Sequence, residues 1–204
     1  MLAEKFLGRY PSHFKINPVV KAFIISESLV WSAWNFVAPI AAVFVINNVL
    51  GGTIQSAAFA YSLHLVSRVI AELWTGRLLV GASDKKKFTY TVVGLFILTI
   101  SYLGFAFTNN LTALYTFYLL FGVGVGIATP AKNSLFSVHL DKNKEATEWS
   151  FNDAAILLSD AVAIILGGFI ATTFGFQPLF IIASIVNLLG IIPYLLKYDK
   201  NLVR

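Results

Sequence analysis

FTYTVVGLFILTISYLGFAFTNNLTALYTFYLLFGVGVGIATPA, residues 88–131, is a run of 44 residues that contains no Asp, Glu, Lys or Arg. Two further stretches, residues 28–67 and 161–196, are equally free of charge over 40 and 36 residues. A helix needs about 20 apolar residues to cross a hydrocarbon core about 30 Å thick, so each stretch holds two crossings joined by an uncharged turn. The sequence therefore predicts an all-α membrane protein of three helical hairpins, with six transmembrane helices.

The composition excludes several classes of protein. Of the 204 residues, 57% are hydrophobic and 12% are charged, which is about half the charged share of a soluble domain. The chain has no cysteine, so a disulfide framework, a thiolate metal site and a thiol nucleophile are excluded. The histidines at 13, 64 and 139 are too scattered for a His-Glu-x-x-His zinc motif. We therefore expect no metal, no cofactor and no intramembrane enzyme.

The basic residues predict the orientation in the membrane. The connections at 47–53, 108–110 and 173–178 carry no Lys or Arg. Basic residues gather instead in four clusters that alternate with them: Lys5, Arg9, Lys15 and Lys21; Arg77, Lys85, Lys86 and Lys87; Lys132, Lys142 and Lys144; Lys197, Lys200 and Arg204. By the positive-inside rule, both termini of this multi-pass protein face the cytoplasm at the inner (plasma) membrane. The net charge of +5 is then explained by topology and by attraction to anionic lipid of the bilayer, and no nucleic-acid partner is expected.

These observations divide the chain into a cytoplasmic N-terminal segment (1–18), a six-helix transmembrane domain (19–196) and a cytoplasmic tail (197–204). The first 18 residues are polar and contain two prolines, which is not the pattern of a signal peptide. The turns on the outer side are too short for an outer domain. The expected spans are 19–46, 53–79, 88–107, 111–136, 149–173 and 179–196.

Ionisable residues inside spans are candidates for function, because a charge near the bilayer centre costs about 2.5 to 3.5 kcal/mol. Two spans carry polar and aromatic residues at helical spacing on one face: Tyr61, His64, Arg68 and Glu72 on the second, and Glu27, Trp31, Trp34 and Asn35 on the first. Glu27 and Arg68 lie at similar depth, so an interhelical ion pair between them is geometrically reasonable. Purely structural bridges, Arg68 with Glu72 and Asp153 with Lys132, are the alternative.

The fifth span adds two acidic residues. Asp153 and Asp160 are seven residues apart, so they face nearly the same way. A low-dielectric environment favours the neutral form of a carboxyl group, which is the chemistry that proton coupling requires. Asp160 and Glu27 are therefore the main candidates for proton coupling, with Asp153 as a third, and His64 is a candidate relay or solute ligand.

Tryptophan and glycine suggest a cavity with closely packed walls. Trp31 and Trp34 are interpreted either as packing bulk or as an aromatic wall that stacks on a sugar or holds a cation. Gly122 and Gly126 on the fourth span allow two helix backbones to approach closely. The prolines at 39, 130 and 193 predict bends.

Two segments carry a resemblance to a known family. Residues 81–87, GASDKKK, resemble the loop signature of the major facilitator superfamily, although the spacing from Gly81 to Asp84 is one residue short and lysine stands where arginine is common. Residues 129–131 (TPA), 167–169 (GGF) and 174–180 (FGFQPLF) are similar to the passage from span four to span six of these transporters. The resemblance implies a gating role for Gly81, Asp84 and Lys85.

The resemblance also implies a mechanism and an assembly. Such transporters have two six-span halves and move a solute by alternating access, so this chain would be one half that works as a homodimer with a twofold axis along the membrane normal. The implied solute cavity contains Glu27, Trp31, Trp34, Asn35, His64 and Arg68. Because its carboxylates (Glu27, Glu72, Asp153, Asp160) outnumber its cations (Arg68, Lys132), a sugar or an amphipathic, cationic compound is the expected solute.

Other classes of protein stay open. The chain could be a six-span subunit without transport activity in a hetero-oligomer, or a fragment of a twelve-span transporter. A pore is disfavoured because no acidic ring or filter segment is present in the sequence.

Overall fold

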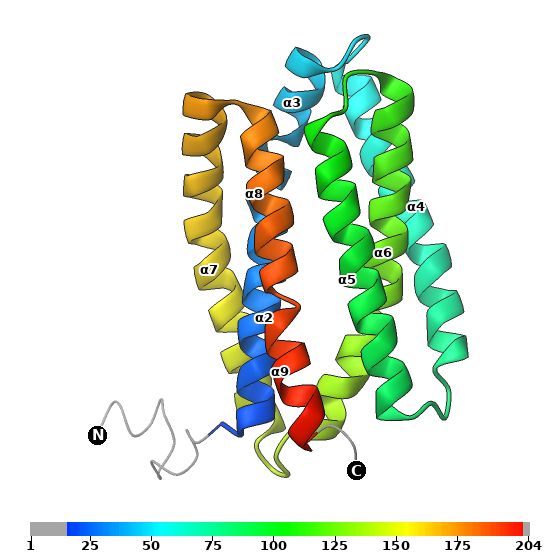
Figure 1. Ribbon diagram of the computed structural model, residues 1–204, viewed down its shortest axis with the longest axis vertical. Helices are drawn as coiled ribbons and strands as arrows, with labels where there is room; N and C mark the ends of the chain where they lie inside the picture. Colours follow the sequence, from blue (N-terminus) through cyan, green and yellow to red (C-terminus); the bar gives the residue numbers. More distant parts are fainter. Residues whose placement is uncertain (1–15, 202–204) are drawn as a thin grey trace.

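The computed structural model describes residues 16–201, and within them every regular element is a helix. The long helices run side by side as a bundle (Figure 1). In chain order they are α2 (Pro18–Asn35), the 3₁₀ helix η2 (Ala38–Ile40), α3 (Ala41–Asn48), α4 (Ile54–Leu78), α5 (Asp84–Ala106), α6 (Leu111–His139), α7 (Glu145–Phe174), α8 (Phe176–Leu189) and α9 (Ile192–Asn201).

The bundle contains the six expected crossings. The described residues include five helical segments that are long and apolar enough to span a membrane: Pro18–Asn48, Asp84–Ala106, Leu111–His139, Glu145–Phe174 and Phe176–Leu196. The remaining expected crossing corresponds to α4, which is not among these five but has 25 residues and is therefore about 37 Å long. It is less apolar because it carries His64, Arg68 and Glu72, and it packs along α6 like its neighbours. The predicted fold class is confirmed.

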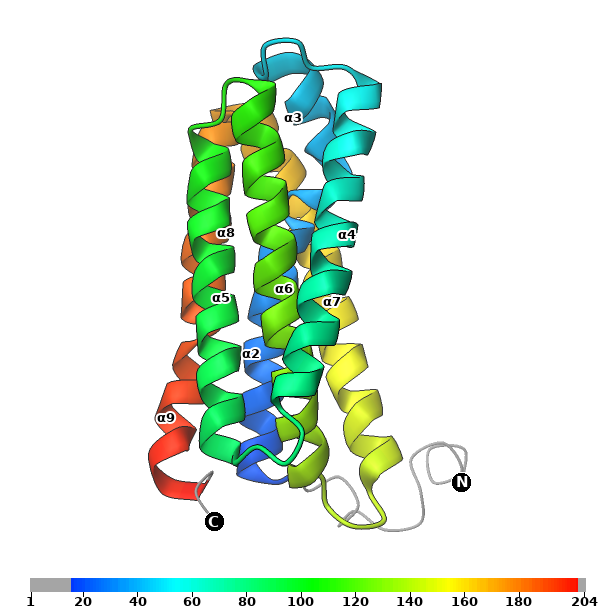
Figure 2. The same cartoon turned by 90° about the vertical axis from the view of Figure 1, so that its right-hand side faces the viewer.

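The helices pack in two groups of three. In one group α4 packs on α6 and α6 packs on α5, and in the other α7 packs on α2 and α8. Contacts of α5 with α8 and of α2 with α6 join the groups. As a result, α4 and α7 lie at opposite edges of the bundle (Figure 1), and Figure 2 shows α4, α6 and α5 side by side.

Side-chain caps fix where the helices begin. The side chains of Asn17, Ser83 and Asn110 accept hydrogen bonds from backbone amides in the first turns of α2, α5 and α6, and Thr53 and Ser56 form a capping box on α4. Such caps satisfy amide groups that have no partner inside the helix. The cap at Ser83 makes α5 begin at residue 84, before the predicted span at 88. The helix α7 begins at residue 145, before the predicted span at 149, without a side-chain cap.

Proline and glycine break the first and last crossings. The first is interrupted by η2, which contains Pro39, and the last between Leu189 and Ile192, one residue before Pro193. Pro130 lies inside α6 without interrupting it. Both breaks occur at prolines where a bend is predicted.

Glycines bring α6 against α4. A Cβ atom on Gly122 would lie 2.0 Å from the Oγ of Ser67, and one on Gly126 would lie 2.6 Å from the carbonyl oxygen of Arg68. Since neither position has room for a side chain, the two backbones are in direct contact. This contact fixes the face of α4 that carries His64.

Both ends of the described chain lie at one end of the bundle. The beginning of α2 and the end of α9 lie beside the loops at 79–83 and 140–144 (Figure 1). The exposed residues Arg77, Lys85, Lys86 and Lys142 belong to the same end. The structure thus separates a basic end from an uncharged end, and the basic end is the one expected to face the cytoplasm.

Candidate functional site

A cavity of about 130 Å³ lies between α2, α4, α5 and α6. Its wall is made of six aromatic rings, two cationic side chains and small or aliphatic residues: Val30, Trp31, Trp34, Tyr61, His64, Arg68, Leu95, Leu98, Tyr102, Phe121, Val125, Ala128, Thr129 and Lys132. Four of the six residues predicted to bind solute, Trp31, Trp34, His64 and Arg68, are on this wall. The other two, Glu27 and Asn35, are not.

Aromatic rings from three helices form one side of the cavity. The ring centroid of Trp34 lies 4.9 Å from that of Phe121, 5.8 Å from that of His64 and 6.4 Å from that of Tyr61. Such distances are typical of packed aromatic pairs. The cluster provides flat apolar surfaces on which a ring-shaped solute can stack.

His64 is the polar group inside this aromatic cluster. His64 is only 4% exposed, and its Nδ1 has no hydrogen-bond partner. Most buried polar atoms in proteins are hydrogen-bonded. An unpartnered nitrogen on a cavity wall is therefore available to a hydrogen-bonding group of a ligand.

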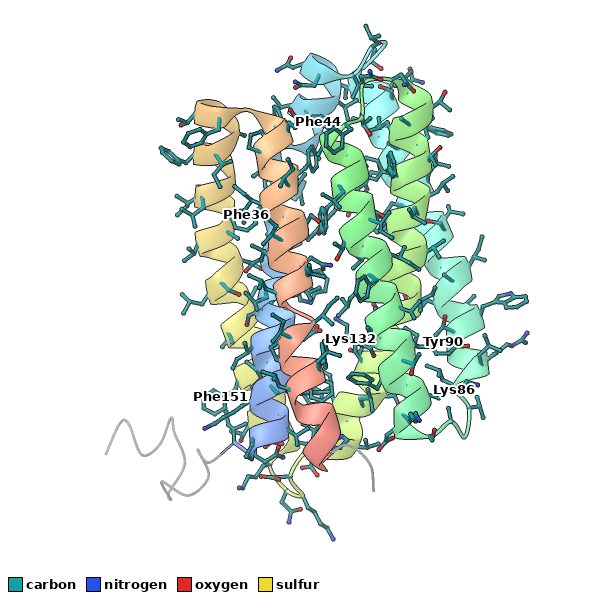
Figure 3. The ribbon with its side chains drawn as sticks, viewed as in Figure 1. Phe36, Phe44, Lys86, Tyr90, Lys132 and Phe151 are labelled. Atoms are coloured by element: carbon teal, nitrogen blue, oxygen red, sulfur yellow. The ribbon has the colours of Figure 1, made fainter. Side chains whose placement is uncertain are left out.

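Glu27 and Lys132 form a buried ion pair below the aromatic cluster. The carboxylate of Glu27 accepts a hydrogen bond from Nζ of Lys132, one from Nε1 of Trp31 at 3.2 Å and one from the Tyr194 hydroxyl at 3.1 Å. The two charged side chains are 11% and 9% exposed. Nζ of Lys132 also lies 5.6 Å from the centroid of the Trp31 ring, within cation–π distance. Figure 3 shows Lys132 in the interior of the bundle.

The predicted ion pair between Glu27 and Arg68 is wrong. Nε of Arg68 instead lies 3.2 Å from Oε2 of Glu72 on the same helix, which is the alternative that the sequence left open. The other alternative, Lys132 with Asp153, is also wrong because Lys132 pairs with Glu27. The Glu27–Arg68 pair is inferred from the depth of each residue along its helix. Depth alone does not say which neighbouring helix a side chain faces.

Asp160 and Asp153 lie outside the cavity. Oδ1 of Asp160 is buried without a hydrogen-bond partner, and the side chain of Asn35 interacts with this carboxyl group. Asn35 also donates to the carbonyl oxygen of Trp31 at 3.2 Å, which connects Asp160 to the cavity wall through one side chain. Asp153 is exposed, and its Oδ1 accepts a hydrogen bond from Nδ2 of Asn152 at 3.5 Å.

The charges on the cavity wall differ from those expected. Arg68 and Lys132 line it, but no carboxylate does. Glu72 and Glu27 face these cations as ion-pair partners. The expected excess of acidic groups is therefore not found at this cavity.

The predicted gating loop lies at the basic end of the bundle, away from the cavity. Gly81 has a φ of +66°, a conformation that favours glycine. Oδ1 of Asp84 pairs with Nζ of Lys87 at 3.3 Å, and Lys85 is exposed. A gating role for Gly81, Asp84 and Lys85 stays a prediction. Among the side chains of residues 16–196, no group of three or more His, Asp or Glu is arranged to hold a metal ion.

Sequence reasoning did not place Tyr194 and Phe121 at the site, and it counted Lys132 among the cations of the cavity without predicting its partner Glu27. Lys132 was grouped with the basic cluster at the end of the fourth span, yet it lies inside α6 and is 7% exposed. Its position two residues after Pro130, within the predicted span, was a signal that it lies in the membrane. Tyr194 and Phe121 carry no such signal, because aromatic residues are frequent throughout the chain.

The sequence profile described as Major Facilitator Superfamily matches residues 23–203. The chain belongs to the major facilitator superfamily. Solved structures of this fold are similar: the POT family transporter PepTSo (TM-score 0.71, 17% identity, 91% of this chain) and a peptide transporter POT, E310Q mutant, in complex with alafosfalin (TM-score 0.74, 18% identity, 90% of this chain).

These likenesses have limits that matter for function. This member of the superfamily covers 38% and 39% of the lengths of those two chains, so it corresponds to less than half of each. At such identities the likeness concerns the fold. No curated protein matches the sequence significantly.

Proposed function

We propose that the chain is one half of a secondary transporter that moves a small solute by alternating access at the inner (plasma) membrane, with both termini cytoplasmic. The observation that carries this proposal is the cavity between α2, α4, α5 and α6, where aromatic rings surround the unpartnered Nδ1 of His64. Transporters of this kind bind solute near the middle of the membrane, between two halves.

Of the two expected solute classes, the cavity fits a sugar better than an amphipathic cation. The rings of Trp31 and Trp34 offer stacking surfaces, and a sugar hydroxyl can donate to Nδ1 of His64. A cationic solute would meet Arg68 and Lys132 on the same wall. The solved structures named above are peptide transporters, so a dipeptide belongs in any ligand screen.

Proton coupling is proposed through Glu27 or Asp160. A proton on Glu27 would remove the charge that holds Lys132, which would weaken the contact between α2 and α6. Asp160 has a carboxyl oxygen without a partner, and this oxygen can carry a proton without the loss of a hydrogen bond. Asp153 is exposed on the same helix and is the weaker candidate.

The second wall of the solute cavity is proposed to come from a second copy of the chain. The edge helices α4 and α7 expose large apolar residues, including Leu65, Val69, Leu157 and Ile164. Because each copy has both ends on one side, two copies related by an axis along the membrane normal keep the same orientation. A separate second half would serve the same purpose.

The proposal is tested with the purified full chain. A thermal-shift screen should find that glucose or a related sugar raises the unfolding temperature more than tetraphenylphosphonium or dialanine does, because a ligand of the folded state stabilises it. In liposomes, uptake of the sugar that binds should require an inward proton gradient and should be abolished by a protonophore.

Two variants locate the coupling group. Of Asp160→Asn and Glu27→Gln, the variant that removes the coupling carboxyl group should uncouple uptake from the gradient. Asp153→Asn should leave the coupling intact. Uptake that ignores the gradient in the wild type would remove proton coupling from the proposal. The absence of binding and uptake for every solute class would support a subunit without transport activity.

A further inference from the structure

A second hollow lies on the outside of the bundle. It is a groove of about 450 Å³ between α4, α5 and α6, the three helices that lie side by side in Figure 2. Its lining is mostly apolar and includes Ile70, Trp74, Leu78, Tyr90, Val123 and Ile127. It is separate from the solute cavity, because Val123 and Ile127 lie on the opposite face of α6 from Val125 and Lys132.

The length and the position of the groove match one leaflet of a bilayer. On α4 it extends over the twelve residues from Ser67 to Leu78, whose Cα atoms span about 16 Å of helix. This is about half of a hydrocarbon core of about 30 Å. The groove begins near the middle of the membrane and ends at the basic end of the bundle, so it faces the acyl chains of a single leaflet.

The end of the groove is positively charged. Arg77, Lys85, Lys86 and Lys87 lie there with one acidic residue, Asp84, which pairs with Lys87. Arg77 and Lys85 are exposed, and neither has an ion-pair partner among the side chains of residues 16–196. These side chains can therefore bind an anionic group at the membrane surface.

Lys86 connects this charge to the groove. Its Nζ donates to the carbonyl oxygen of Leu78 at 2.9 Å and lies 5.9 Å from the centroid of the Tyr90 ring. Both Leu78 and Tyr90 line the groove, and Figure 3 shows Lys86 and Tyr90 together near the basic end of α5. The ammonium group is thus held at the mouth of the groove.

From this arrangement we infer that the groove binds one anionic phospholipid of the basic-side leaflet. An acyl chain lies along α4 against Trp74, and the phosphate headgroup contacts Lys86 and Lys85. An apolar groove alone would accept any lipid, whereas the lysines at its mouth select for negative charge. The site is distinct from solute binding and does not depend on the identity of the solute.

The test uses the full chain in phosphatidylcholine vesicles. One set of vesicles contains phosphatidylglycerol with brominated acyl chains, and the other contains phosphatidylcholine with brominated acyl chains. Trp74 is 69% exposed and lines the groove, so its fluorescence reports contact with a brominated chain, and a Trp74→Phe variant identifies its share of the signal. We expect stronger quenching by the brominated phosphatidylglycerol than by the brominated phosphatidylcholine at equal mole fraction.

Charge variants separate the site from general attraction to the surface. Lys85→Gln should lower the preference for phosphatidylglycerol about fivefold, and Lys86→Gln should lower it by a similar factor. Lys142→Gln removes the same charge from the other inner loop, where Lys142 is exposed, and should leave the preference unchanged. Equal quenching by both lipids, or an equal loss in the Lys142 variant, would overturn the inference.

A groove-filling variant tests the acyl-chain part. Val123→Phe places a ring in the groove without changing the charge, so it should reduce quenching of Trp74 by both brominated lipids. Undiminished quenching in this variant would show that the lipid does not occupy the groove.

Discussion

At the scale of single residues, Glu27 is the most constrained charged group in the site. Its carboxylate is shared by Lys132, Trp31 and Tyr194. Glu27→Gln would leave the Lys132 ammonium buried without an opposing charge, which costs about 3–5 kcal/mol in comparable pairs. We therefore expect a clear fall in thermal stability, measured by helical circular dichroism in detergent.

Two companion variants make this prediction specific. Glu72→Gln breaks the pair of Glu72 with Arg68. Because the side chains of Arg68 and Glu72 are 31% and 37% exposed, this change should cost less stability than Glu27→Gln does. The double variant Glu27→Gln with Lys132→Met removes both charges and should recover most of the lost stability. If the double variant is no more stable than Glu27→Gln alone, the pair is not what the single change disrupts.

His64 gives a prediction about binding. Its Nδ1 has no hydrogen-bond partner, and its ring packs against Trp34 and Phe121 on the cavity wall. His64→Phe keeps the aromatic packing but removes the hydrogen-bonding group, so affinity for the sugar that binds should fall about two- to tenfold. Isothermal titration measures this, and Tyr90→Phe, a change outside the solute cavity, should leave the affinity unaltered.

The individual polar residues were easier to find in the sequence than their partners were. Glu27, His64 and Arg68 stand out because charge is expensive inside a span. Their partners depend on which way each helix is rotated in the bundle, and the sequence contains no measure of that rotation. Hence Lys132, and not Arg68, faces Glu27.

At the scale of helices, the contact of α6 with α4 makes a prediction. Gly122→Ala would place a Cβ atom 2.0 Å from the Oγ of Ser67 and 2.3 Å from the carbonyl oxygen of His64. Because the His64 carbonyl oxygen belongs to the backbone of α4, the whole helix must move to make room for the added Cβ atom, at a cost of about 1–3 kcal/mol. Thermal unfolding should show the loss, and sugar affinity should fall with it.

Gly168 on α7 is the matched control for Gly122. A Cβ atom there would meet nothing within 4 Å. Gly168→Ala should therefore be neutral or slightly stabilising, since alanine favours a helix more than glycine does. Equal destabilisation by both variants would mean that the cost comes from the helix backbone and not from contact with α4.

The helices themselves could be predicted almost completely. Uncharged runs define crossings because charge is excluded from the hydrocarbon core. The runs do not define helix ends, because helices continue into the headgroup region until a cap or a turn stops them. Thus α5 begins at Asp84 after the cap Ser83, four residues before the charge-free run. The prolines at 39 and 193 indicated the breaks, while Pro130 produced none.

At the scale of the whole molecule, the order of helices in space was available only through the resemblance. Hydropathy predicts six crossings but gives no neighbours, whereas the bundle places α4 and α7 at opposite edges with α2 and α6 between them (Figure 1). Of the residues in an apolar 18-residue stretch of α7, only 11% are buried. An edge helix so little covered by its own chain is consistent with a second six-helix unit beside it.

A twofold axis along the membrane normal makes a specific prediction about that unit. Rotation by half a turn brings the α4 edge of one copy against the α7 edge of its partner. Leu65 lies between Tyr61 and Arg68 on one face of α4, and Ile164 follows Asp160 by one turn on α7. Leu65 and Ile164 are 42% and 43% exposed. Each lies about 15 Å from the uncharged end of the bundle, where α4 begins and α7 ends.

Because the chain contains no cysteine, Leu65→Cys combined with Ile164→Cys tests this geometry directly. Oxidation in liposomes should produce a covalent dimer, because the cysteine at position 65 of each copy lies against the cysteine at position 164 of the other. Replacing Leu65→Cys by Ile100→Cys moves the first cysteine to an exposed position on α5, which should face lipid and should prevent the cross-link. A monomer mass in nanodiscs together with undiminished uptake would contradict the dimer, since one six-helix unit alone leaves the cavity without a second wall.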